Sequence, residues 1–219
     1  MFEAAIFDWD GTLADTRRVV VASFQKALKD IQCEISGDFI EKRIGIGAAE
    51  TFREILRRSN RPFDEALIRH LVEKKIQNEI DLSADVRLFD GALALLEQLR
   101  GRVKLGLASM NDREVIEHLL KTTNTQRFFD AVLTAADVAR SKPDPEIFLK
   151  CASKLGVSAG KCVVFEDSIF GVKAAKSAGM TCIAVTTGVY PREALEKEKP
   201  DLVVSSLSEK GKILSFIFQ

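Results

Sequence analysis

The sequence predicts an α/β fold in which a doubly wound parallel sheet carries an inserted all-helical cap domain. Short apolar runs that do not alternate, such as AAIF at 4–7, are typical of strands buried on both faces of a parallel sheet. From residue 86 onward such runs alternate with amphipathic helical segments, which is the order of βαβ units. The segment 16–84 has no convincing strand. A helical unit therefore follows the first strand directly.

Within the insert, helices are expected at 16–32, 38–45, 48–58 and 64–82, because apolar side chains recur there at helical spacing. After the insert, the expected order is helix 91–100, strand 103–109, helix 112–121, strand 131–135, helix 143–155, strand 161–167, helix 168–178, strand 180–187, helix 192–197 and strand 201–205.

Three boundaries have local signals. Asn111 or Asp112 suits the cap of its helix, Pro143 suits a first helical turn, and Gly179 suits a helix end. The terminal ILSFIF is too short to span a membrane and is expected to pack on the core.

This order divides the chain into a discontinuous, Rossmann-like core at 1–14 and 85–219 and a helical cap at 15–84. Hinges are expected near 13–15 and 84–86. Ligands of doubly wound sheets bind outside the carboxyl ends of the strands. The residues that end each apolar run are therefore the candidates for a site.

Composition excludes several classes of function. The chain has 219 residues, with 46% hydrophobic and 29% charged, as in an ordinary globular protein. The 32 basic residues balance the 32 acidic ones, so there is no electrostatic reason to expect nucleic acid or membrane binding. The four cysteines lie far apart without a CxxC pair, and no leader precedes Phe2. Buried free thiols, a cytoplasmic location and a monomer are expected.

Four strand ends supply polar side chains, namely Asp8 with Asp10, Ser109 to Asn111, Lys142, and Glu166 with Asp167. Mg²⁺ prefers hard oxygen ligands, and two carboxylates with one carbonyl suffice to hold it. A phosphoryl group needs a nucleophile, a cation and N–H or O–H donors. Asp8 can be that nucleophile if Mg²⁺ and Lys142 offset its repulsion from phosphate. Asp10 could then protonate the leaving oxygen and later activate water.

These segments carry a resemblance to a known family. DWDGTLADT, LASMN, SKPDP and FEDSIFGVKAAKSAG resemble, in order and spacing, the four motifs of the haloacid dehalogenase superfamily of phosphotransferases. The helical insert is similar to the small cap of the phosphoglycolate phosphatase and β-phosphoglucomutase branch. The resemblance covers essentially the whole chain and implies an α/β core with a cap.

The resemblance also implies roles for individual residues. Asp8 would be the nucleophile and Asp10 the general acid/base, while Ser109 and Lys142 would hold the transferring phosphate. Mg²⁺ would bind the Asp8 side chain, the Asp10 carbonyl and Asp167, with Glu166 as a nearby carboxylate. The predicted phosphate contacts are completed by Gly11, Thr12, Met110 and Asn111.

Two departures from the mutase pattern favour a phosphatase. The mutase-like pattern has a His where this chain has Val20, and an Arg after the cap's glycine turn where it has Ala48. A cap lysine could be matched by Lys74 or Lys75. The expected function is a Mg²⁺-dependent phosphatase acting on a small phosphorylated metabolite. A β-phosphoglucomutase-like phosphomutase is the alternative, followed by a catalytically silent metabolite-binding protein.

Other conspicuous residues have simpler interpretations. His70 and His118 lie in helical patterns without a partner motif, so a structural or surface role is expected. Trp9 is expected to pack against the sheet or the cap. Arg17 and Arg18 could reach a substrate or lie on a solvated helix face.

Overall fold

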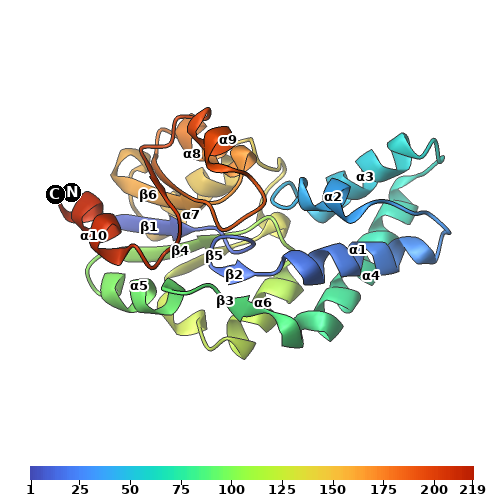
Figure 1. The fold of residues 1–219 in the computed structure, drawn as a ribbon, viewed down its shortest axis with the longest axis horizontal. Helices are drawn as coiled ribbons and strands as arrows, with labels where there is room; N and C mark the ends of the chain where they lie inside the picture. Colours follow the sequence, from blue (N-terminus) through green and yellow to red (C-terminus); the bar gives the residue numbers. More distant parts are fainter.

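The computed structural model describes all residues from 1 to 219. Its core is a six-stranded parallel sheet in the order β5-β4-β1-β6-β7-β8, with helices on both sides (Figure 1). The strands are β1 (Ala4–Phe7), β4 (Lys104–Ala108), β5 (Ala131–Leu133), β6 (Cys162–Glu166), β7 (Thr181–Val185) and β8 (Leu202–Val204). The predicted α/β class and parallel sheet are confirmed.

Successive side chains of β1 enter two different hydrophobic clusters, which explains its uninterrupted apolar run. Ala5 and Phe7 face one cluster, and Ala4 and Ile6 face the other. The first cluster is covered by α5 (Ala92–Leu99), α6 (Arg113–Thr122) and α10 (Lys210–Phe218). The second is covered by α7 (Glu146–Leu155), α8 (Ile169–Ser177) and α9 (Arg192–Glu196). The first strand is therefore central and buried on both faces.

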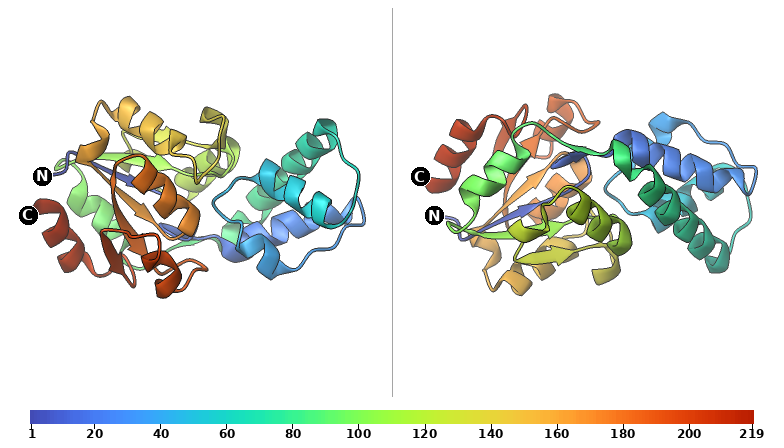
Figure 2. Two further views of the ribbon diagram at one scale, coloured as in Figure 1. Left: turned by 90° about the horizontal axis from the view of Figure 1, so that it is seen from above. Right: turned by 90° about the horizontal axis from the view of Figure 1, so that it is seen from below.

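Four helices form a group at one end of the molecule, away from the two neighbouring termini (Figures 1 and 2). They are α1 (Arg17–Lys29), α2 (Gly37–Glu41), α3 (Ala48–Arg58) and α4 (Glu65–Leu82). This group has its own cluster of 12 buried apolar residues, in which the Phe24 and Phe52 rings lie 4.7 Å apart. We call residues 15–84 the cap, in keeping with the proposed division of the chain.

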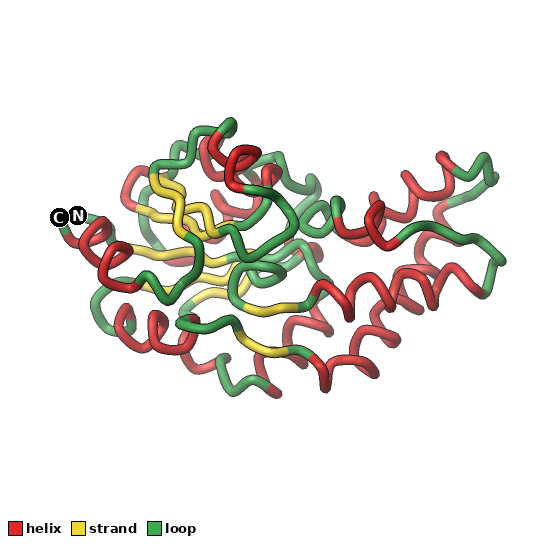
Figure 3. The backbone as a smooth tube through the Cα atoms, viewed as in Figure 1, coloured by secondary structure: helices red, strands yellow, loops and turns green.

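A two-stranded antiparallel ribbon joins the cap to the core. Its strands are β2 (Ala14–Asp15) and β3 (Arg87–Leu88), which Figure 3 shows side by side below the sheet. These strands were not predicted, because two residues are too few to show a period. The ribbon holds the entry and exit of the cap together.

Some predicted boundaries were wrong. The helix expected at 38–45 ends at Glu41, and the one expected from Pro143 begins at Glu146. The Asp144 carboxylate accepts the Glu146 amide at 3.0 Å, which favours a turn before the helix. The C-terminal run ILSFIF packs on the core as predicted. It is part of helix α10, and its Phe216 ring stacks on Phe2.

All four cysteines are buried free thiols, as predicted. None of the helices combines the length and the apolar character needed to cross a membrane.

Candidate active site

The chain turns sharply at the carboxyl end of β1. The Trp9 carbonyl accepts the amides of Thr12, Leu13 and Ala14, and Gly11 adopts a φ of +83°. A side chain at position 11 would also collide with Asp167, since an added Cβ would lie 2.3 Å from its Oδ2. The turn therefore requires glycine for two reasons. It places Asp8 and Asp10 at the end of the sheet where the strands have their carboxyl ends.

Lys142 lies beside Asp8 with its ammonium group fully buried. Its Nζ donates to Asp8 Oδ1 at 2.7 Å, to Glu166 Oε1 at 2.6 Å and to the Ala108 carbonyl at 3.1 Å. Because an ammonium has three N–H donors, all of them are used. The structure thus places Lys142 on the predicted nucleophile. Its predicted contact with phosphate would require one of these bonds to be released.

Glu166 is also completely occupied. Its Oε2 accepts the amides of Asp167 and Ser168 and the Ser168 hydroxyl, each at 3.0 Å. Oε1 faces Lys142, so both oxygens already have donors within the protein. Asp8, Glu166 and Asp167 have oxygens within 4.8 Å of one another. Of the three, we assign Glu166 to holding Lys142.

Three oxygens at this site accept no hydrogen bond from the protein, namely Asp8 Oδ2, Asp167 Oδ2 and the Asp10 carbonyl. Asp167 is fixed through its other oxygen, which accepts the Thr12 hydroxyl at 3.1 Å. Hard, unpaired oxygens on two carboxylates and a carbonyl are the ligands that Mg²⁺ prefers. Gly11 and Gly188 leave room beside Asp167 that a Cβ would fill. The residues present therefore fit a Mg²⁺ site.

The Asp10 carboxylate points away from these three unpaired oxygens and toward the cap. It accepts the Thr16 hydroxyl at 2.7 Å, the Ser109 hydroxyl at 3.2 Å and Asn111 Nδ2 at 3.4 Å. Thr16 precedes α1 without capping it through its side chain, because its hydroxyl is used here. Sequence reasoning missed Thr16, although its position just after the DWDGTLAD segment is a usable signal.

The amides of Trp9, Asp10 and Met110 make no hydrogen bond within the protein. They lie at the ends of β1 and β4, beside Asp8, and can receive the oxygens of an anion. Met110 was predicted to bind phosphate. The amide of Trp9 was not, because that residue was assigned to packing, which its full burial in the core cluster confirms.

Three of the predicted phosphate contacts, at Gly11, Thr12 and Asn111, stay predictions, and their donors bond within the protein in this structure. The Gly11 and Thr12 amides are bonded inside the turn, and the Thr12 hydroxyl donates to Asp167. The Asn111 amide donates to Ser109 Oγ at 3.0 Å, and its side chain faces the cap. These residues shape the site, but their donors are already used.

Burial and like charges disfavour ionisation of the two carboxylates in the metal-free site. Burial raises the pKa of Asp8 well above its ordinary value, and Lys142 opposes this shift while Glu166 and Asp10 add to it. Burial also raises the pKa of Asp167, with Glu166 and Asp8 contributing. For Lys142, burial lowers the pKa, but Asp8 and Glu166 outweigh it, so the pKa is raised. A cation bound here would lower the pKa of both aspartates, because it stabilises their charged forms.

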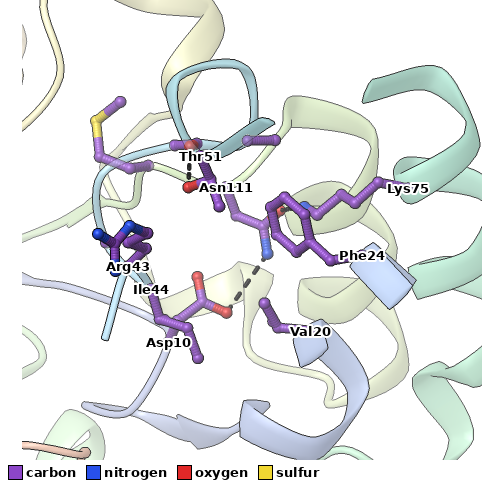
Figure 4. A pocket seen from close by; sticks show the side chains of 12 residues that line it. Asp10, Val20, Phe24, Arg43, Ile44, Thr51, Lys75 and Asn111 are labelled. Atoms are coloured by element: carbon purple, nitrogen blue, oxygen red, sulfur yellow. Dashed lines mark hydrogen bonds between the residues drawn. The ribbon is translucent and has the colours of Figure 1, made fainter. Parts of the chain in front are cut away.

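The cap covers Asp10 with a small pocket of about 30 Å³, shown in Figure 4. Val20 and Phe24 come from α1, Arg43 and Ile44 from the loop after α2, and Lys75 from α4. Lys75 is buried, whereas Lys74 is exposed and lies 3.7 Å from Asp30. Of the two lysines considered from the sequence, only Lys75 reaches this pocket.

Lys75 belongs to a buried polar group that sequence reasoning missed. Its Nζ lies 2.6 Å from Glu79 Oε2 and 3.1 Å from Asp112 Oδ2, and donates to Asn111 Oδ1 at 2.6 Å. The buried positions of α4 are Ile68, Leu71, Lys75 and Glu79. Charged residues that continue an apolar helix face were the available signal.

The remaining predicted positions are placed as follows. Val20 is buried in the wall of the pocket and Ala48 is buried at the start of α3. Arg17 lines a second cavity of about 80 Å³ beside Asp167, whereas Arg18 is exposed. His70 is exposed, and the His118 ring lies 2.8 Å from the Ser83 hydroxyl.

Comparison with known proteins identifies the family. The family model described as haloacid dehalogenase-like hydrolase matches residues 5–185. The chain belongs to the haloacid dehalogenase-like hydrolase family. The matched residues include β1, β4 and β6 with the polar side chains at their carboxyl ends. The resemblance inferred from the four motifs is thereby confirmed.

Individual members of the haloacid dehalogenase-like hydrolase family match over nearly the full length. The chain is 30% identical to validoxylamine A 7'-phosphate phosphatase from Streptomyces hygroscopicus subsp. limoneus, covering 95% of this chain and 96% of the relative. It is 29% identical to β-phosphoglucomutase from Bacillus subtilis, with 95% of each covered. A crystal structure of a hydrolase from Pseudomonas syringae superposes with a TM-score of 0.90 at 26% identity, covering 99% of this chain and 100% of the other.

Proposed function

We propose that this chain is a Mg²⁺-dependent phosphatase that hydrolyses a small phosphorylated metabolite through an aspartyl-phosphate on Asp8. The proposal rests on the different surroundings of Asp8 and Asp10. Asp8 has one oxygen bonded to Lys142 and one without a donor, beside three unused amides. Asp10 is held by hydroxyl and amide groups and faces the cap pocket. The first arrangement suits a nucleophile, and the second suits a group that moves protons.

The first step is attack of Asp8 on phosphorus. The bond from phosphorus to the alcohol oxygen breaks, and Asp10 donates its proton to that oxygen. The second step is attack of water on the aspartyl-phosphate, with Asp10 taking the proton of the water. Inorganic phosphate leaves, and Asp8 and protonated Asp10 are restored. The amides of Trp9, Asp10 and Met110 would bind phosphoryl oxygens, and the Ser109 hydroxyl would join them by releasing its bond to Asp10.

Mg²⁺ would be held by the Asp8 and Asp167 side chains and the Asp10 carbonyl, and it would supply positive charge that screens the phosphoryl group from the aspartates. Lys142 would keep Asp8 ionised and in place, since its ammonium is 2.7 Å from Oδ1. Glu166 would hold Lys142.

A phosphomutase is the second candidate, because one of the matching relatives is named β-phosphoglucomutase. Val20 argues against it. This residue lines the pocket beside Asp10 with an apolar side chain, where a titratable group could assist phosphoryl return. The two functions differ in product, since a mutase isomerises a sugar phosphate and a phosphatase releases inorganic phosphate.

The cap is part of the proposal. Its loop contacts the core directly, as the Tyr190 hydroxyl donates to the Lys42 carbonyl at 2.8 Å. We propose that the cap moves about the β2–β3 ribbon to admit substrate, and that it excludes bulk water when closed. A monomer in the cytoplasm remains the prediction for the protein as a whole.

The test is Mg²⁺-dependent phosphate release from p-nitrophenyl phosphate by the Asp8→Ala variant. We expect a loss of about ten-thousandfold in kcat/KM, because the nucleophile is removed. The matched control is Asp38→Ala, which removes an exposed carboxylate on α2 without hydrogen bonds and should leave the rate unchanged. Substantial activity in Asp8→Ala would exclude the proposed mechanism.

A further inference from the structure

The ammonium of Lys75 lines the pocket over Asp10, and its charge is compensated by two carboxylates. Its Nζ donates to Asn111 Oδ1 at 2.6 Å and to Asp112 Oδ2 at 3.1 Å, and it lies 2.6 Å from Glu79 Oε2 as an ion pair without hydrogen-bond geometry. In Figure 4 the Lys75 side chain runs alongside Phe24 toward Asn111. The charge of the one buried cation of the cap is therefore compensated within the protein itself.

Glu79 is the carboxylate nearest to the Lys75 ammonium. Lys75 can only donate, so it identifies the Asn111 atom facing it as the oxygen, and the Asn111 nitrogen then donates to Glu79 Oε1 at 2.7 Å. Glu79 Oε2 makes no hydrogen bond and lies 2.6 Å from Lys75 Nζ. Glu79 is completely buried and, as a carboxylate, cancels the charge of Lys75. Asp112 adds a second negative charge from the start of α6.

Arg43 is the other cation of the pocket, and it is also neutralised. Its Nε is paired with Glu54, its Nη1 donates to the Phe39 carbonyl at 3.1 Å, and its guanidinium lies 3.5 Å from the centre of the Phe39 ring. Two cations are therefore matched by three carboxylates, those of Glu54, Glu79 and Asp112. The pocket therefore has no uncompensated positive charge.

We propose that this pocket takes the alcohol part of a phosphate ester that is small, uncharged and hydroxylated, and that it discriminates against an alcohol part carrying a second anionic group. Glu79 is the specificity-determining residue. A hydroxyl group can donate to the Asp10 carboxylate that lines the pocket, whereas an anion would meet this carboxylate while both cations of the pocket are already paired with Glu54, Glu79 and Asp112. This inference rests on the proposed phosphatase function and names its substrate class.

The experiment compares two esters of nearly equal size, 2-hydroxyethyl phosphate and phosphoglycolate, which differ by a hydroxymethyl and a carboxylate group. We expect wild-type kcat/KM to favour the uncharged ester about tenfold, because the cap offers no free cation. In Glu79→Gln the freed charge of Lys75 should shift this ratio about tenfold toward phosphoglycolate. Glu73→Gln removes an exposed charge from the same helix and should leave the ratio unchanged.

A second variant, Asp112→Asn, acts at a partly exposed position and should shift the ratio in the same direction as Glu79→Gln. A wild-type preference for phosphoglycolate, or an unchanged ratio in both variants, would overturn the inference. If p-nitrophenyl phosphate is still hydrolysed, the proposed function stands. Absence of turnover on all three esters would overturn both.

Discussion

Asp8 and Asp10 both follow the same buried strand, yet their neighbours give them different chemistry. Asp8 faces an ammonium and unused amides, whereas Asp10 faces hydroxyls and the cap. Strand alternation alone would put side chains two residues apart on the same face, but both carboxylates lie beyond β1, where the turn around the Trp9 carbonyl leaves Asp10 facing the cap. At the scale of single residues, the site depends on Lys142, because this side chain joins Asp8 and Glu166.

Lys142→Met is expected to destabilise the fold as well as to abolish activity. The substitution leaves Asp8 and Glu166 buried without their counter-ion, and removing one partner of a buried pair costs about 3 kcal/mol. Chemical denaturation would measure this loss. Lys150→Met is the control, since its ion pair with Glu146 is half-exposed and should contribute little. Equal stability of the two variants would show that Lys142 is not a structural counter-ion.

At the scale of elements, α8 must approach β6 closely so that Glu166 can hold Lys142. An added Cβ at Gly171 would lie 1.8 Å from the Glu166 carboxyl carbon, whereas at Gly211 in α10 it would meet nothing within 4 Å. The small residue Gly171 of the GVKAAKSAG run thus serves close packing of helix and sheet.

Alanine substitutions at these two helical glycines should therefore have opposite effects. Gly171→Ala should lower stability and activity together, because it displaces Glu166. Gly211→Ala should raise the free energy of unfolding by about 0.5–1 kcal/mol, since alanine restricts the unfolded chain and favours the helix. Thermal unfolding and turnover of p-nitrophenyl phosphate would check both variants. A neutral Gly171→Ala would contradict the assigned contact.

The elements of the core were predictable because each strand is a compact apolar run between turn signals. Polar residues at strand ends then predicted which side chains meet, as Asp8, Lys142 and Asp167 do. The β2–β3 ribbon was not predictable, because its two pairs depend on contact between segments that lie far apart in the chain. The contact of Glu79 with Asn111 was not predictable for the same reason, although the charged positions on the buried face of α4 were a usable signal for Glu79 itself.

At the scale of the whole molecule, the site lies where the cap meets the core. Its buried carboxylates are expected to make the stability of the fold depend on pH and on bound Mg²⁺. The pKa values of Asp8 and Asp167 lie above their ordinary value of 3.8 in the metal-free protein. A raised pKa in the folded state means that stability is present at low pH and is lost as pH rises above 3.8 through the raised value.

Mg²⁺ should therefore raise the melting temperature more at neutral than at acidic pH, because protons compete with the cation for the same oxygens. Melting curves with and without Mg²⁺ at several pH values would measure this. In Asp167→Asn the Mg²⁺ effect should largely disappear, and the metal-free protein should melt higher than the wild type. An Mg²⁺ effect of equal size at all pH values would contradict the site assigned here.

The central claim is that Asp8 carries the phosphoryl group during turnover. Its most direct test is mass spectrometry of the Asp10→Asn variant, quenched in acid after exposure to Mg²⁺ and p-nitrophenyl phosphate. Loss of the group that activates water should let the intermediate accumulate. The expected result is one phosphoryl group on Asp8, within the tryptic peptide 1–17. A phosphoryl group on another residue, or none while the aryl alcohol is released, would contradict the account.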